Sequence, residues 1–220
     1  MQVIWVLMSV LACSMALVAS PVSAEGLQDE VDQAATIIER FQAVPEKALP
    51  AAVLKDAKGL AIMTVIKAGF VLSGRGGKGV VVARTKNGWS GPSAIGTGGA
   101  GFGFQIGAEV TEFVIILNTD AAVQAFSQDA NVALGGSLSV AAGPIGRSVE
   151  AGVMPVAAVY TYSQSQGLFA GIALEGTVIG VRNDANAAYY GRAVTPEDIL
   201  SGKIRPPAGA DRLRKVLAKY

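Results

Sequence analysis

The chain has 220 residues, of which 51% are hydrophobic and 16% charged, with a formal net charge of +1. This length is enough for one domain with a sizeable core. There is no histidine, and the one cysteine is Cys13, so the rest of the chain excludes disulfides, Cys/His metal sites and Ser-His-Asp or Cys-His nucleophiles. We therefore expect no metal and no cofactor.

The first 24 residues have no charged side chain and are mostly apolar from Val3 to Val18. They end in Val22-Ser23-Ala24, which puts small residues where signal peptidase requires them. We predict a signal peptide over residues 1–24, cleaved after Ala24, and export to a periplasmic or extracellular location. Two alternatives stay open: the run is long enough to be an uncleaved membrane anchor, and Cys13 is a candidate for lipidation.

Residues 27–43 carry apolar side chains at helical spacing, with an acidic opposite face. This pattern predicts an amphipathic surface helix that docks on the domain and ends at Pro45. A second short helix is expected from Pro50 to Lys58, with Gly59 as its stop.

From Leu60 onward, apolar side chains recur every second residue, as in a strand, and no longer at helical spacing. The segments 60–66, 69–74, 79–85 and 88–95 are typical of short strands joined by turns, and Asn87-Gly88 is a hairpin signal. Between Gly99 and Val110, glycines occupy one face of an expected strand and apolar residues the other. Another element should therefore pack close to the bare face.

Glycine is dense from Gly69 to Gly107, and two segments there fit GxGxxG: Gly74, Gly76 and Gly79, and Gly96, Gly98 and Gly101. A dinucleotide site needs a helix after the motif and an acidic residue about twenty positions on. Here a strand pattern follows each match, and no acid lies between Asp56 and Glu109. Lys78 also lacks the Ser or Thr that follows the lysine of a Walker loop. We exclude a nucleotide ligand.

The later part of the chain continues the mixed pattern. Residues 112–118 predict a buried strand, and Thr119 caps a short helix that runs to Phe126. Further elements are expected as strands at 137–143, 149–153, 156–164, 168–176 and 177–182, and as helices at 183–190, 195–202 and 213–220. The predicted fold is one α+β domain over residues 25–220. Its antiparallel, glycine-rich, barrel-like sheet is flanked by an N-terminal amphipathic helix and short C-terminal helices.

Charge is unevenly distributed: residues 25–46 are acidic, whereas residues 55–86 and the tail are basic. Five basic residues in and around the glycine-rich hairpin are candidates for contact with anionic lipid headgroups: Arg75, Lys78, Lys67, Lys55 and Lys58. Arg75 and Lys78 lie among glycines whose N–H groups would form an anion-binding nest; the alternative is a solvated hairpin tip. A secondary basic patch is expected on the final helix, at Arg212, Arg214, Lys215 and Lys219.

Other function classes fit less well. An enzyme would depend on carboxylates, lysines and tyrosines, but the odd spacing of Glu109 and Glu112 places them on opposite faces of a strand. Tyr160 and Tyr162 share a strand face, either as interfacial anchors or in cross-strand packing. The near-neutral charge, without a basic patch interleaved with exposed aromatics, argues against nucleic acid. Export and alternating strands permit an outer-membrane barrel or envelope structural protein, but helical segments at both ends fit that class poorly.

Four blocks of sequence, at residues 59–84, 87–117, 160–176 and 187–202, carry a family resemblance. They include VLSGRGGKGVVVAR and GWSGPSAIGTGGAGFGFQIG, and they resemble the SYLF domain in the right order over roughly residues 49–202. That domain is found beside SH3 or FYVE domains in eukaryotic membrane-trafficking and actin-patch proteins, and alone in exported bacterial proteins. The resemblance implies lipid binding, with phosphoinositides as the ligands of eukaryotic members, actin binding in some fungal members, and no catalysis.

The resemblance and the charge pattern together predict an exported, non-enzymatic, membrane-associated protein. Its partner is expected to be an anionic phospholipid or phosphoinositide-type headgroup. The alternative is a protein-interaction or structural module of the cell envelope.

Overall fold

The computed structural model describes residues 26–43, 49–128, 131–134, 140–142, 157–167 and 177–220. The predicted signal peptide, its cleavage site after Ala24, and Cys13 lie outside the described residues. The strands expected at 149–153 and 168–176 lie outside them as well.

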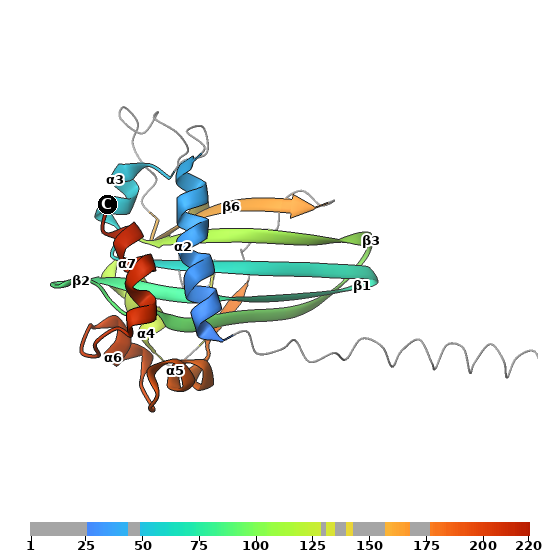
Figure 1. Ribbon diagram of the computed structural model, residues 1–220. Coiled ribbons are helices and arrows are strands. Elements are labelled where there is room, and N and C mark those ends of the chain that lie inside the picture. Colours follow the sequence, from blue (N-terminus) through green and yellow to red (C-terminus); the bar gives the residue numbers. More distant parts are fainter. Residues whose placement is uncertain (1–25, 44–48, 129–130, 135–139, 143–156, 168–176) are drawn as a thin grey trace, which may run out of the picture.

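The centre of the fold is a single hairpin of two long strands (Figure 1). Strand β1 runs over Gly59–Thr85 and β3 over Ser93–Leu117, 27 and 25 residues long. They pair antiparallel from Gly59↔Leu117 to Val81↔Ser93, with one irregularity between Phe70 and Leu72. The expectation of several short strands joined by turns was therefore wrong. The turn at Asn87-Gly88 is confirmed, because Gly88 has φ 98° and its strand pairs back onto Thr85.

The hairpin curls until the two halves of β1 face each other. The backbone N–H of Arg84 donates to the carbonyl oxygen of Lys58 at 2.8 Å. A Cβ added at Gly77 would lie 2.8 Å from Val65 Cγ2, and one added at Gly79 would lie 2.5 Å from the Cα of Met63. Gly77 and Gly79, expected from the sequence near turns, are therefore positions of close approach inside a continuous strand.

Shorter strands extend the sheet on both sides of the hairpin: β2 Gly88–Trp89, β4 Val132–Ala133, β5 Val140–Ala142, β6 Val159–Gly167 and β7 Val178–Val181. The order is β2-β1-β3-β6-β5, and β7 pairs with both β3 and β4. Among the described pairs, β5 and β6 are parallel and the rest antiparallel. The predicted antiparallel, barrel-like sheet is confirmed as a curled half-barrel.

The described helices are α2 Leu27–Ala43, α3 Ala51–Asp56, α4 Asp120–Ser127, α5 Asn183–Tyr190, α6 Pro196–Leu200 and α7 Asp211–Leu217, with a 3-10 turn at Ala208–Ala210. The side chains of Thr119 and Thr195 accept the N–H groups of Ala122 and Asp198, so both predicted helix caps are confirmed. Helices at both ends of a curled sheet confirm the α+β class.

Alternation along the strands gives the sheet two apolar faces. On the outer face, Ile62, Val80 and Val114 pack against α2, α3 and α7. On the inner face, Met63 and Phe113 pack with residues of α4 and α6. Figure 1 shows α2 and α7 lying side by side across the outer face. Tyr160 and Tyr162 belong to the outer core and are each only 5% exposed, which selects the packing role over the interfacial one.

One buried amide joins α5 to the start of β3. Asn186 is fully buried; its Oδ1 accepts the N–H of Ala94 at 2.7 Å, and its Nδ2 donates to Ser93 Oγ at 3.1 Å. We expect Asn186→Ala to lower the free energy of unfolding by about 2 kcal/mol, because it leaves a buried N–H without a partner. Urea denaturation measures this, and a loss no larger than that of an exposed alanine substitution would contradict it.

Candidate lipid-binding surface

The glycine-rich segment around Arg75 and Lys78 is regular strand. The cross-strand pairs Arg75↔Gly99 and Lys78↔Gly96 belong to the β1–β3 ladder. None of the glycines from Gly74 to Gly79 has a positive φ. An anion-binding nest requires a turn or alternating conformation, so the predicted nest is not formed here.

Arg75 and Lys78 point to opposite faces of the sheet. Lys78 shares its face with Val80, in the outer core, because the two are two residues apart. Arg75 shares its face with Val81, in the inner core, and its Nε lies 3.0 Å from where a Gly99 Cβ would be. The two cations therefore do not bind one headgroup together. By the same alternation Lys67 lies on the inner face, with Glu109 as its cross-strand partner.

The two carboxylates of β3 lie on opposite faces, as their spacing predicts. Glu112 contacts Arg40 of α2, on the outer face. Glu109 is 1% exposed, and its Oε1 has no hydrogen-bond partner among the described residues. Within the described part of the chain, no three His, Cys, Asp or Glu side chains gather in a way that would hold a metal ion.

Lys55 and Lys58 lie at the other end of the hairpin, near its turn. Both are exposed, and they flank the end of α3. The guanidinium of Arg84 donates to the carbonyl oxygens of Leu54 and Ala57 and lies 4.5 Å from the ring centroid of Trp89. The five predicted headgroup residues thus fall into three places: Lys78 outside, Arg75 and Lys67 inside, and Lys55 with Lys58 at the turn.

Only part of the predicted C-terminal basic patch points to solvent. Arg212 donates to α2, at the Asp32 carbonyl, the Thr36 hydroxyl and the Glu39 carboxylate, and Arg214 donates to the Trp89 carbonyl at 2.9 Å. Lys215 and Lys219 are exposed. Figure 1 shows α7, which carries Lys215, at the same end of the molecule as α3, which carries Lys55.

An apolar cavity opens on the outer face beside Lys78. Its volume is about 680 Å³. Its apolar walls come from α2, β1 and β3, and include Ala34, Ile37, Ile62, Ile66 and Val110, with Lys78 among the polar lining residues. We call it the apolar cavity. This size and this largely apolar lining are typical of pockets that bind small molecules.

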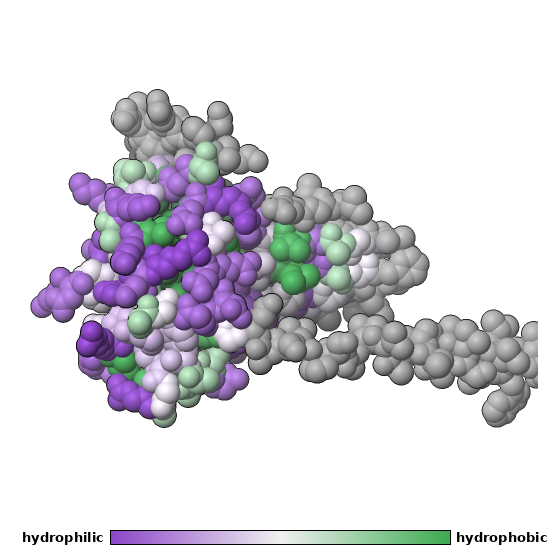
Figure 2. All heavy atoms as spheres, in the orientation of Figure 1, coloured by the Kyte–Doolittle hydropathy of each residue, from purple (hydrophilic) through white to green (hydrophobic). Residues whose placement is uncertain are grey.

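The rim of the apolar cavity carries exposed apolar side chains. Ile66 and Val110 are cross-strand partners and are 54% and 40% exposed. Figure 2 shows green surface on the sheet beside α2, next to a largely purple helical face. Exposed apolar surface next to a basic residue is typical of membrane or ligand contact.

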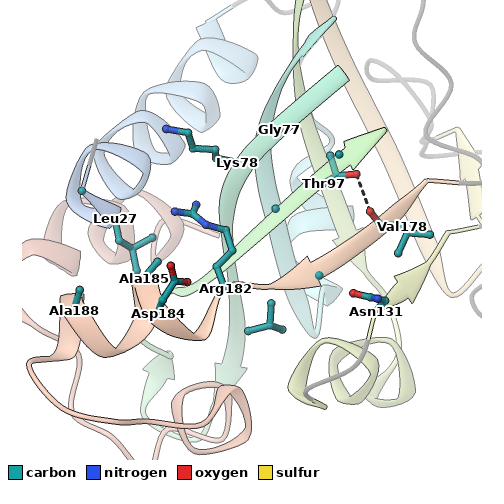
Figure 3. A pocket seen from close by; sticks show the side chains of 15 residues that line it. Leu27, Gly77, Lys78, Thr97, Asn131, Val178, Arg182, Asp184, Ala185 and Ala188 are labelled. Carbon is teal, nitrogen blue, oxygen red and sulfur yellow. Dashed lines mark hydrogen bonds between the residues drawn. The ribbon is translucent and has the colours of Figure 1, made fainter. Parts of the chain in front are cut away.

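A second cavity, of about 780 Å³, adjoins the first and shares Gly77, Lys78 and Thr97 with it. Figure 3 shows Lys78, Arg182 and Asp184 on one side of this cavity and Asn131 on the other. Arg182 forms an ion pair with Glu30 of α2 at 2.7 Å. The second cavity is therefore the more polar of the two.

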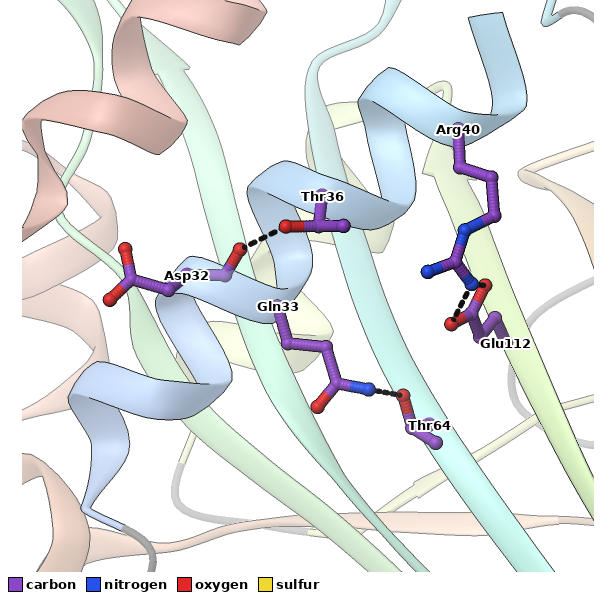
Figure 4. A network of polar contacts seen from close by, with 6 residues as sticks. All are labelled: Asp32, Gln33, Thr36, Arg40, Thr64 and Glu112. Atoms are coloured by element: carbon purple, nitrogen blue, oxygen red, sulfur yellow. Dashed lines mark hydrogen bonds and ion pairs between the residues drawn. The ribbon is translucent and has the colours of Figure 1, made fainter. Parts of the chain in front are cut away.

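Helix α2 forms one wall of the apolar cavity and is fixed to the sheet along its length. Figure 4 shows Arg40 against both carboxylate oxygens of Glu112, and Gln33 donating to the hydroxyl of Thr64. At the start of the helix, Glu30 is held by Arg182. The acidic residues of this helix thus serve partly in internal ion pairs, which the sequence did not predict.

Ile66, Val110 and Arg182 are the site residues that sequence reasoning missed. Ile66 and Val110 lie in apolar strands that predict burial, and their exposure depends on where α2 crosses the sheet. No sequence motif surrounds Arg182.

Among the described helices, none has the length and apolar character needed to cross a bilayer.

Comparison with known proteins gives a consistent set of relatives. A family described as "Ysc84: Las17-binding protein actin regulator" matches residues 98–220. LAS seventeen-binding protein 3 of Saccharomyces cerevisiae is 50% identical over 201 residues, which cover 87% of this chain and 44% of that protein. SH3 domain-containing YSC84-like protein 1 of Bos taurus is 48% identical over 202 residues, covering 88% and 59%. The chain thus spans about half the length of the curated relatives it matches.

Proposed function

The chain belongs to the Ysc84 family, the family of the SYLF domain, and from this premise we propose that it is a non-enzymatic protein that binds anionic lipid at a membrane surface. The observation that carries the proposal is the exposed pair Ile66 and Val110 at the rim of the apolar cavity, with Lys78 in its wall. The apolar pair enters the interface, and Lys78 attracts phosphate or carboxylate groups. A basic residue near an anionic surface contributes about 1 kcal/mol.

Other features support the non-enzymatic part of the proposal. Glu109 and Glu112 lie on opposite faces of β3, and the family description names a regulator rather than an enzyme.

We also propose export, with the protein acting in the periplasm or outside the cell, because of the apolar, uncharged first 24 residues.

Vesicle co-sedimentation of the full chain tests lipid binding. We expect binding to anionic or phosphoinositide-containing vesicles that weakens as salt rises, and little binding to neutral ones. Lys78→Gln should weaken binding to anionic vesicles about fivefold, from the loss of about 1 kcal/mol. Arg75→Gln, on the opposite face of the same strand, is the matched control and should leave binding unchanged. Both variants keep the apolar residues 1–24, so any membrane binding by that segment is the same in both.

The outcomes separate the function from the site. Loss of binding in a Lys55→Gln, Lys58→Gln double variant, with Lys78→Gln unaffected, would move the site to the turn end of the hairpin. No difference between anionic and neutral vesicles would reject the lipid proposal.

A second candidate is a protein-interaction module. The family description and the yeast relative's name refer to Las17 binding and actin regulation, and the exposed surface of Lys55, Lys58, Lys215 and Lys219 suits an acidic partner. Filamentous actin in place of vesicles, in the same centrifugation assay, distinguishes this candidate from lipid binding.

A further inference from the structure

We propose that the apolar cavity holds the tail of a single-chain anionic amphiphile, such as a long-chain carboxylate, with its head group at Lys78. This deepens the proposed function, because a ligand of this kind is held by the protein itself and not only by adsorption to a bilayer. The volume and lining of the cavity and the position of Lys78 in its wall support this proposal.

The lining separates into an apolar part and a polar part. Ile37 of α2 and Ile66 of β1 contribute apolar surface, and Val110 of β3 stands at the rim. Glycines of the segment 74–79 also line the cavity; an added Cβ at Gly74 or Gly76 would meet nothing within 4 Å, so the backbone leaves open space there. An apolar lining around a volume of about 680 Å³ suits an aliphatic chain better than a polar molecule.

Charge complementarity selects an anionic head group. Lys78 lies at the junction of the two cavities, and Arg182 lines the second one. Glu30, which also lines the apolar cavity, forms an ion pair with Arg182. The ammonium group of Lys78 has three N–H donors, so it can donate a hydrogen bond to an anion in addition to its contacts within the protein.

The wall that would cover the tail is fixed in place. Glu30, Gln33 and Arg40 tie α2 to the rest of the fold through Arg182, Thr64 and Glu112. A preformed site of this kind loses little entropy when it binds a flexible chain. The occupant is therefore a small amphiphile that enters from the Ile66–Val110 rim, and the helix need not detach.

Calorimetric titration of the full chain with carboxylates from octanoate to dodecanoate, without vesicles and below their micelle concentrations, tests the inference. Each added methylene should raise the affinity about fourfold until the cavity is full, after which the affinity levels off. Decanol should bind more weakly than decanoate. Lys78→Gln should weaken decanoate binding about tenfold while leaving decanol unchanged.

Two exposed valines provide a matched pair of variants. Val110 and Val178 are 40% and 45% exposed; Val110 lines the apolar cavity, whereas Val178 lines only the second one. Val110→Ser should lower decanoate affinity several-fold, and Val178→Ser should leave it unchanged. Thermal denaturation checks that both variants fold.

Affinity without dependence on chain length, or an equal loss in the two valine variants, would overturn the inference. Vesicle binding without binding of monomeric carboxylates would reject the cavity ligand and leave the proposed function standing. Binding of the carboxylates without vesicle binding would support the cavity ligand and reject the membrane-surface function.

Discussion

Replacing Gly79 by alanine is expected to destabilise the protein by more than about 3 kcal/mol, or to prevent folding. A Cβ at this position would lie against the carbonyl oxygen of Ile62 and 2.5 Å from the Cα of Met63. Both are backbone atoms, which cannot rotate away as a side chain can, so the two halves of β1 would have to separate. Overpacking of ordinary cores costs about 1–3 kcal/mol, and a backbone clash exceeds that range. Urea denaturation followed by circular dichroism measures the effect.

Gly76→Ala is the matched control for Gly79→Ala. Gly76 lies three residues earlier on the same strand, and an added Cβ there would meet nothing within 4 Å. Alanine at this position should change the unfolding free energy by at most about 0.5 kcal/mol, the range of ordinary surface substitutions. Equal effects of the two substitutions would show that the halves of β1 do not pack as closely as described.

Replacing Arg40 by leucine should lower the unfolding free energy by about 2 kcal/mol. Arg40 contacts both oxygens of Glu112 at 2.6 Å, and the Glu112 side chain is only 10% exposed. Removal of one partner of a buried ion pair costs about 3–5 kcal/mol, because the other charge stays buried without compensation. The value expected here is smaller because the Arg40 side chain is 39% exposed and solvent screens the pair.

Two further variants isolate the ion pair of Arg40. The double variant Arg40→Leu, Glu112→Leu should recover most of the lost stability, because no unpaired charge is left buried. Lys203→Ala breaks an exposed pair with Asp198 and should leave the denaturation midpoint unchanged. If Arg40→Leu also leaves the midpoint unchanged, the contact does not fasten α2.

The elements with strong periodicity could be predicted from the sequence. Helix α2 begins and ends at the predicted residues because its apolar positions recur at helical spacing over 17 residues. Thr119 and Thr195 were recognised as caps because their side chains bond locally to the next turn. These features depend on neighbours in the sequence, so no knowledge of the tertiary structure was needed.

The long strands could not be predicted in the same way. A glycine that permits a turn and a glycine that permits close packing look identical in sequence, and Gly77 and Gly79 are of the second kind. The shared nest expected for Arg75 and Lys78 is not formed for the same reason: three residues apart on a continuous strand, their side chains face opposite ways. The exposure of Ile66 and Val110 depends on the path of α2, which no local pattern specifies.

The fastening of α2 has a consequence for the order in which the chain folds. Its partners Arg182 and Arg212 lie 152 and 180 residues further along the chain from the α2 residues they bind, Glu30 and Asp32. Because contacts this distant form only after both segments have left the ribosome, the packing of α2 is completed only after Arg182 and Arg212 have been synthesised. A nascent chain that stops before Arg182 can already pair Arg40 with Glu112, but it lacks the contacts to Glu30 and Asp32, so the native outer core closes only after α7 has been made.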